Sequence, residues 1–192
     1  DVPMELRPLQ DPHPPLWYPS SNPDGSKYAG ENGFHYCTLG GVEMAKANIA
    51  AYREAYEKRG STVGAQRPFP GGAAIGISRQ VTVAETDAEA LKIAGPAYKV
   101  WHDSLTKLWR DNNVEGPSFA RNTVDTVEKA IAGGAHIAGS PETVRQQLAE
   151  QIDALGVKYL VMAFNIGDMA HEDALRSITL FGEEVMPMLA DL

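Results

Sequence analysis

Residues 140–167, SPETVRQQLAEQIDALGVKYLVMAFNIG, predict one helix followed directly by one strand. Ser140 is a typical N-cap, and Pro141 suits the first helical position because the N–H that proline lacks has no helical partner there. Gly156 is suited to end the helix in a left-handed conformation. Between them an apolar stripe recurs at spacings of four, four and three: Val144, Leu148, Ile152 and Leu155.

The strand expected at residues 159–164, YLVMAF, is apolar throughout, which is typical of a strand buried on both faces. A helix that leads into such a strand through a short turn is the repeating unit of an α/β fold with a parallel sheet. The residues that follow, 165–168, include asparagine, glycine and aspartate. In such folds, ligands bind at this carboxyl end of the strands.

Composition narrows the class of protein. The 192 residues are 43% hydrophobic and 22% charged, as expected for one soluble domain with a sizeable core. The net charge of −8 argues against nucleic acid or an anionic membrane as a partner, since both require a basic face. Cys37 is the only cysteine, so no intrachain disulfide is possible and a reducing cytoplasm is expected. No run approaches the roughly 18 apolar residues of a membrane span, and no signal peptide opens the chain.

Three more strand–helix pairs are predicted before residue 112. The strands are expected at residues 16–18, 34–39 and 74–83, and the helices at 22–33, 42–59 and 86–111. Gly95 and Pro96 predict a kink or break in the third helix, because proline cannot continue the helical hydrogen bonding.

The second half of the chain contains an insertion before the unit at 140–167. Residues 112–122 predict a loop, residues 123–132 another helix and residues 133–139 a connection. A last helix is expected at 173–189. We therefore expect a single domain over 1–192, with a helical insertion at about 84–139.

Four βα units suggest half of a closed barrel. An open sheet of these strands would lack the inward-facing charges that protect edges, whereas a (β/α)8 TIM-type barrel of about 250 residues or more has no edges. Residues 1–15 hold five prolines and predict an extended lead-in, and the sequence starts at Asp1 without a methionine. The expected fold is thus the C-terminal four βα units of such a barrel, with an N-terminal half missing.

Four segments resemble, in order, those of bacterial luciferase-like flavin monooxygenases. They are residues 7–15, RPLQDPHPP, with the strand after them; residues 83–87, VAETD; residues 139–144, GSPETV; and residues 181–187, FGEEVMP. The similarity covers nearly all of the chain. It implies a (β/α)8 barrel that uses reduced FMN and O2 to oxidise a small organic substrate, as a homo-oligomer or with a flavin reductase. A sister branch of the family uses a deazaflavin cofactor and transfers hydride.

The resemblance leaves the catalytic residues unassigned. The first four strands of the family carry many contacts to the flavin ring and the substrate, and in several members a catalytic histidine, but they have no counterpart in this sequence. This leaves a different class of function open, in which the chain is a non-catalytic half-barrel that self-associates to cover its sheet edges and apolar face.

The first candidate cofactor-binding group is Ser20, Ser21 and Asn22. These residues lie where a strand's carboxyl end meets a helix N-terminus, which offers unpaired N–H groups and a positive dipole to a phosphate. The resemblance implies that this loop contacts the FMN phosphate, chiefly through the two serines. The structural alternative is that Asn22 only caps its helix while the serines stay solvated.

The second candidate group follows the next strand and comprises Thr38, Gly40 and Gly41. Glycines there allow close approach of a ligand to the backbone, but they also serve as ordinary punctuation between a strand and a helix. Cys37 is expected to be a small buried hydrophobe rather than a nucleophile.

The remaining candidates carry less information. Three cations are expected in loops or at strand ends, and any of them could meet a flavin phosphate: Arg67, Arg79 and Arg121. No pair of histidines has a metal-ligand spacing such as HExxH, so no metal site is expected. His102 is expected to be exposed, His136 to lie in a loop, and His171 to lie in a loop or at a helix N-terminus. The aromatic stripe from Tyr98 to Trp109 predicts either a buried helix face or an interface.

Overall fold

The computed structural model describes residues 9–10, 13–59 and 73–190. Within them the chain forms an α/β fold around one five-stranded sheet, all of whose pairings are parallel. The strands are β1 (Trp17–Ser20), β2 (His35–Thr38), β3 (Ile75–Val83), β4 (His136–Gly139) and β5 (Tyr159–Ala163). The predicted α/β class with a parallel sheet is confirmed.

β3 is the central strand. Ile77 pairs with Thr38 of β2 and with Leu160 of β5, so these two strands flank β3 on opposite sides. Further along, Gln80 pairs with both β4 and β5. β2 and β4 therefore follow one another along the same edge of β3, and β3 extends past the carboxyl end of β2.

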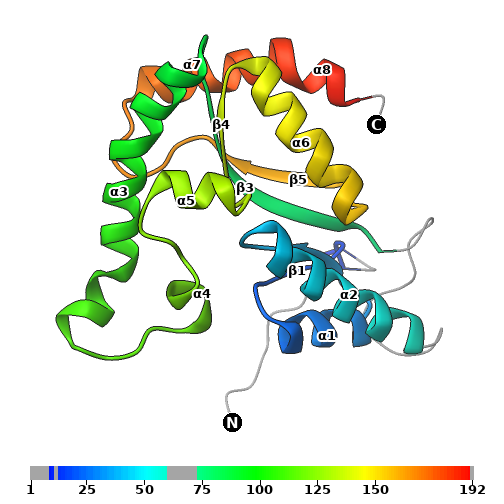
Figure 1. Cartoon of the computed structure of the whole chain (residues 1–192). Helices are drawn as coiled ribbons and strands as arrows, with labels where there is room; N and C mark the ends of the chain where they lie inside the picture. Colours follow the sequence, from blue (N-terminus) through cyan, green and yellow to red (C-terminus); the bar gives the residue numbers. More distant parts are fainter. Residues whose placement is uncertain (1–8, 11–12, 60–72, 191–192) are drawn as a thin grey trace.

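Helices cover the outer face of the sheet (Figure 1). α1 (Pro23–Glu31) and α2 (Val42–Lys58) pack on β1 and β2, while α6 (Pro141–Leu155) packs between α2 and the C-terminal helices. The last helical run comprises α7 (His171–Leu180), a π-helical turn η1 (Phe181–Val185) and α8 (Met186–Leu189). The helix predicted at 140–155 is confirmed, with Ser140 accepting from the Thr143 N–H and Gly156 at φ +59°.

The segment at about 84–139, which we expected to be a helical insertion, contains α3 (Asp87–Asp111), α4 (Ser118–Arg121), α5 (Val127–Ala132) and strand β4. A break near Pro96 was the wrong expectation, because α3 continues through it; buried Ala94, Ala97 and Tyr98 hold the helix on both sides. The short α4 lies inside the predicted loop. The expected connection at 133–139 contains β4. This strand was not predicted because it is only four residues long and follows two glycines and an alanine.

The inner face of the sheet is partly open. Side chains of β5 alternate between exposed and half-buried, with Tyr159 and Val161 about half exposed, so the expected burial of this strand on both faces is wrong. The exposed residues are Tyr159, Val161 and Ala163, which alternate along the strand and therefore lie on the same face of the sheet. The Trp17 ring lies 5.3 Å from that of Tyr159, so aromatic side chains from β1 and β5 meet across the sheet.

Among the described helices, none is long and apolar enough to cross a membrane.

Candidate functional site

A cavity of about 410 Å³ lies at the carboxyl ends of β1 and β2, beneath α3 and α5. The inner-face residues Ser78 and Gln80 of β3 and Ala163 of β5 form its floor. Its walls come from the loops after β1 and β2 and from the insertion. The size and the mainly apolar lining with a few polar groups are typical of sites for small molecules and cofactors.

The loop after β1 is held by its own hydrogen bonds. Ser20 Oγ donates to Asn22 O at 3.1 Å and accepts from Asn22 N at 3.2 Å, and the Ser20 side chain is buried. Asn22 Oδ1 accepts from Gly25 N at 2.9 Å, which is the N-cap of α1. The capping alternative for Asn22 is therefore present in the structure. A contact of Ser20 or Asn22 with a cofactor stays a prediction.

Ser21 is the member of this group that lines the cavity. In the described part of the chain its hydroxyl makes no side-chain hydrogen bond, so it is available to a ligand. The loop that carries it is anchored from below by Tyr36, whose hydroxyl lies 2.6 Å from Ser26 Oγ and donates to Ser20 O at 3.3 Å.

The loop after β2 contributes Gly40 and Gly41 to the cavity, whereas Thr38 is buried beneath it. Thr38 Oγ1 accepts from Asn48 Nδ2 at 3.3 Å, which pins β2 to α2. Gly40 has φ +89°, a left-handed conformation that favours glycine. A Cβ on Gly41 would lie 2.4 Å from Gly133 O, so this glycine also permits close packing of α2 on α5.

Arg79 was expected in a loop or at a strand end, but it is buried in the middle of β3. Its Nε donates to Gln151 Oε1 at 2.7 Å, and Nη1 donates to the carbonyl of Gly40 at 2.8 Å. Burial lowers the pKa of the guanidinium to about 10. Arg79 therefore acts from behind the cavity wall, by holding Gly40 in place.

The other expected cations lie elsewhere. Arg121 is exposed at the end of α4 and pairs with Glu115 at 2.5 Å, and Arg67 falls outside the described residues. The cation that does line the cavity is Lys129 of α5, which pairs with Asp125 at 2.7 Å. Sequence reasoning missed it, because nothing local marks one exposed lysine on a short helix as facing a cavity.

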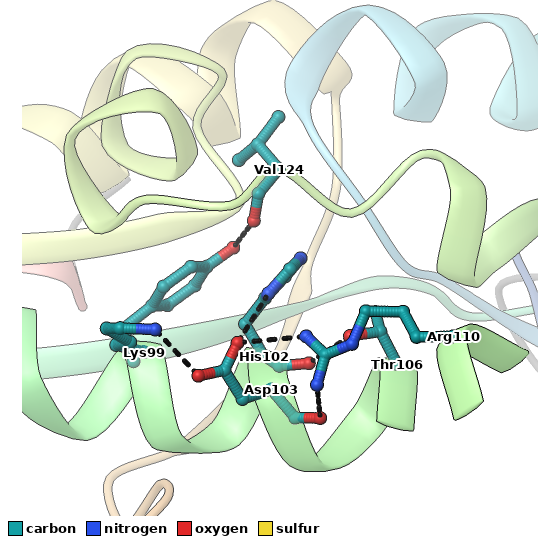
Figure 2. A network of polar contacts seen from close by, with 7 residues as sticks. Lys99, His102, Asp103, Thr106, Arg110 and Val124 are labelled. Carbon is teal, nitrogen blue, oxygen red and sulfur yellow. Dashed lines mark hydrogen bonds and ion pairs between the residues drawn. The ribbon is translucent and has the colours of Figure 1, made fainter. Parts of the chain in front are cut away.

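The wall from α3 is aromatic, and polar contacts made by neighbouring residues of the same helix are shown in Figure 2. Tyr98, Trp101 and Leu105 line the cavity, and Tyr98 donates to the Val124 carbonyl at 2.8 Å, which ties α3 to the loop before α5. Burial raises the pKa of Tyr98 to about 12, so its hydroxyl stays protonated. The stripe expected on this helix thus divides, since Leu108 is largely exposed.

Asp103 joins two cations of α3 by hydrogen bonds, and it lies in the sequence between the wall residues Trp101 and Leu105. It accepts from Lys99 at 2.7 Å and from Arg110 at 3.1 Å, and these hydrogen bonds lower its pKa to about 2. His102 lies 3.7 Å from the same carboxylate and is half-buried rather than exposed as expected.

A buried histidine lies behind the cavity floor. His136 was expected in a loop, but it belongs to β4 and has no exposed surface. Its Nδ1 lies 3.3 Å from Gln80 Oε1 and its Nε2 lies 3.2 Å from Thr82 Oγ1. Burial lowers the pKa of the imidazole to about 4, so it is neutral at pH 7. Sequence reasoning missed this group, although alternating polar residues at 78, 80 and 82 among apolar ones signal a polar inner face.

Two further observations bear on chemistry. Burial raises the pKa of the Cys37 thiol, as expected for a small buried side chain in β2. Across residues 9–10, 13–59 and 73–190, no three His, Cys, Asp or Glu side chains gather in an arrangement that could hold a metal ion.

The sequence profile of the luciferase-like monooxygenase family matches residues 2–159. The chain therefore belongs to the luciferase-like monooxygenase family.

Two curated relatives match nearly the whole chain. An uncharacterized protein, y4wF, of Sinorhizobium fredii is 26% identical over 186 residues, which is 97% of this chain and 52% of that protein. The 2,5-diketocamphane 1,2-monooxygenase 2 of Pseudomonas putida is 24% identical over 177 residues, 88% of this chain and 47% of the enzyme. The chain spans about half the length of the curated relatives it matches.

Solved structures agree on the fold. The monooxygenase RslO1 from Streptomyces bottropensis matches with a TM-score of 0.69 at 22% identity, over 97% of this chain and 52% of that one. The oxygenating constituent of 3,6-diketocamphane monooxygenase from Pseudomonas putida, in complex with FMN, gives 0.62 at 21%, over 89% and 47%. An F420-dependent secondary alcohol dehydrogenase with an F420-acetone adduct gives 0.61 at 18%, over 92% and 49%.

Proposed function

We propose that this chain is the C-terminal half of a (β/α)8 flavin-dependent monooxygenase that uses reduced FMN and O2 to oxidise a small organic substrate. The observation that carries the proposal is the cavity at the carboxyl ends of β1 and β2, where ligands bind in parallel α/β folds. Family membership and the FMN complex of a structurally similar enzyme support the choice of cofactor.

The residues present fit a flavin. Among the lining residues, Ser21 offers a hydroxyl, and Gly40 and Gly41 offer backbone without side chains, as a phosphate requires. Lys129, which pairs with Asp125, brings an ammonium group to the lining. The aromatic wall of Tyr98 and Trp101 suits a flat ring system.

Bound flavin would supply the electrons and the reaction with O2, and the protein would supply binding, orientation and shielding from water. In this proposal, Ser21 binds the phosphate of the cofactor, and Arg79 fixes the neighbouring Gly40 backbone by donating to its carbonyl. The α3 wall excludes water, because the Tyr98–Val124 hydrogen bond closes it against the loop before α5.

The substrate of the Pseudomonas putida relative, as its name states, is a camphane diketone. A cyclic ketone is therefore the first substrate class to test. The deazaflavin F420 is the alternative cofactor, supported by the similar F420-dependent dehydrogenase, and hydride transfer without O2 would then replace oxygenation. A second barrel half, a flavin reductase and homo-oligomerisation are the partners that we propose for the complete protein.

The test is a titration of the full product of the gene with FMN and, separately, with F420, in which the fluorescence of the cofactor reports binding. FMN binding is expected, and Ser21→Ala should weaken it roughly tenfold or more, because a hydrogen bond to a charged group is lost. Ser104→Ala, on the exposed side of α3, is the matched control and should bind as the unmodified protein does.

Two outcomes would contradict the proposal. If the protein binds neither FMN nor F420, the proposed enzyme function is wrong, and a non-catalytic, self-associating half-barrel is favoured. Binding of F420 alone, with no oxygen incorporated into a ketone substrate when reduced FMN and O2 are supplied, shifts the assignment to the deazaflavin branch.

A further inference from the structure

The floor of the cavity contains a hydrogen-bonded group whose role the proposed function does not include. Gln80 of β3 lines the cavity, and behind it His136 of β4 connects Gln80 to Thr82. His136 and Thr82 are both fully buried. The Tyr98 ring meets the imidazole edge-on, with ring centroids 5.8 Å apart, so the histidine is held on a third side.

Hydrogen-bond accounting selects one tautomer of His136. A neutral imidazole carries one N–H, at Nδ1 or at Nε2. If Nε2 carried it, the buried Thr82 hydroxyl would accept that proton, and its own O–H would lack an acceptor among the described residues. If Nδ1 carries it, Thr82 donates to Nε2 and each of these buried groups is paired. The second arrangement is therefore the favourable one.

This tautomer determines which way Gln80 faces. The Nδ1–H of His136 donates to Gln80 Oε1, 3.3 Å away, so the carboxamide oxygen is occupied. The other end of the carboxamide, its NH2 group, has no hydrogen-bond partner among the described residues, and it is not one of the buried unpaired atoms. It therefore faces the cavity that Gln80 lines.

We propose that Gln80 determines ligand specificity by presenting its NH2 group as a donor to a carbonyl oxygen, and that His136 and Thr82 are positioning residues that hold it in this orientation. The inference rests on the proposed function, in which the same cavity binds the flavin and the ketone substrate. The carbonyl has two possible sources, namely the ring system of the flavin or a ketone substrate. An amide donor recognises either of them, because it can pair with an acceptor and cannot pair with a second donor.

The orientation is tested first, without any ligand, by nitrogen NMR of His136 in the 15N-labelled protein. The Nδ1–H tautomer is expected near pH 7. Thr82→Val removes the hydroxyl that donates to Nε2 and should change the nitrogen shifts of His136. Thr106→Val is the matched control, because that hydroxyl bonds within α3 to the His102 carbonyl and should leave the His136 signals unchanged. Observation of the Nε2–H tautomer in the unmodified protein would overturn the proposal.

Recognition is tested with Gln80→Leu, which removes the donor and keeps a similar side-chain volume. The probes are FMN and the bicyclic ketone camphor, with its oxygen-free skeleton, camphane, as the reference ligand. A loss of about tenfold in FMN affinity assigns the carbonyl to the flavin, and a similar loss for camphor but not camphane assigns it to a ketone substrate. Gln146→Leu, on the exposed face of α6, is the matched control and should alter neither affinity.

The outcomes separate this inference from the proposed function. Tight FMN binding that Gln80→Leu leaves unchanged, together with unchanged camphor binding, would overturn the role of Gln80 and leave the flavin assignment standing. Camphor binding that depends on Gln80, in a protein that binds no flavin, would do the reverse. Failure to bind any of the probes would overturn both.

Discussion

At the residue scale, the candidate site depends on buried side chains that do not line the cavity. Tyr36 is fully buried, yet its hydroxyl contacts Ser26 and the carbonyl of Ser20, and so holds the loop that presents Ser21. Arg79 does the same for Gly40 from the other side of the wall. A loop held in this way loses less conformational entropy when a ligand binds.

Tyr36→Phe should lower the free energy of unfolding by about 1–2 kcal/mol, because a buried hydrogen-bonding hydroxyl is lost while the ring packing remains. Urea denaturation followed by circular dichroism measures the change. Tyr28→Phe, which alters a half-exposed tyrosine on the same layer, is the control and should change stability by less than about 0.5 kcal/mol. Equal effects of the two substitutions would show that the buried contact contributes nothing.

His136 makes stability depend on pH. Burial lowers its pKa to about 4 from the usual 6.5, so between these values the unfolded chain binds a proton that the folded chain does not. The free energy of unfolding is therefore not reduced by His136 above pH 6.5, and it falls by about 3 kcal/mol as the pH drops to 4. His35, whose pKa is also lowered by burial, adds in the same direction.

His136→Gln should flatten the pH dependence of the unfolding free energy between pH 4 and 6.5, as measured by urea denaturation at a series of pH values. His35 is retained in the variant, so the difference between the two curves reports His136 alone. His171→Gln, which removes an exposed imidazole, is the control for the substitution itself. A parallel pair of curves for His136→Gln and the unmodified protein would contradict the assignment.

At the element scale, two departures from expectation have clear causes. α3 continues through Pro96 because the alanines and Tyr98 on either side of it are packed into a core, and tertiary packing outweighs the lost backbone hydrogen bond. β4 was not predicted because its four residues, His136–Gly139, are too few to show a periodic pattern. Only its pairing with β3 defines it as a strand.

Pro96→Ala should stabilise the protein by about 1–3 kcal/mol, because alanine restores the N–H that bonds to the Lys92 carbonyl and removes the proline ring from the helix interior. The gain is reduced by the greater freedom of alanine in the unfolded chain. Thermal denaturation is the measurement. Pro141→Ala, at the first position of α6 where proline is tolerated, should give no gain. Destabilisation by Pro96→Ala would mean that the proline ring packs productively.

At the scale of the whole molecule, the sheet has one covered and one partly open face. Trp17, Tyr159 and Val161 are each 41–52% exposed on the inner face, on or near the edge strands β1 and β5. Apolar side chains gathered on an open sheet face indicate a surface that is covered by other protein. The relatives, about twice as long as this chain, have the additional length that could cover it.

We expect the 192-residue chain by itself to associate in a concentration-dependent way through this face. Val161→Lys should weaken that association, because burying a lysine against an apolar surface is unfavourable. Sedimentation velocity over a range of concentrations measures it. Val100→Lys, on the exposed side of α3, matches the change in charge and should leave the association constant unaltered. A monomer at all concentrations would contradict the expectation.

The sequence alone determined the features that are encoded locally. The cap at Ser140, the left-handed Gly156 and the apolar stripe between them specify α6, since each requires only neighbours within a few residues. Short local segments also carried the resemblance to the family, namely residues 7–15, 83–87, 139–144 and 181–187. The match of the family profile to residues 2–159 confirmed that family. Ser21, Gly40 and Gly41 could be predicted at the cavity because they follow strands in a parallel α/β pattern.

The tertiary structure alone decided which side chains share a surface. Gln80 and His136 are 56 residues apart, and only the pairing of β3 with β4 brings them together. Tyr98, Trp101 and Lys129 reach the cavity because the insertion folds back over the strand ends. Arg79 lies behind Gly40 because β3 is flanked by β2. These contacts arise from the register of strands distant in sequence, a property of the assembled sheet that no local pattern encodes.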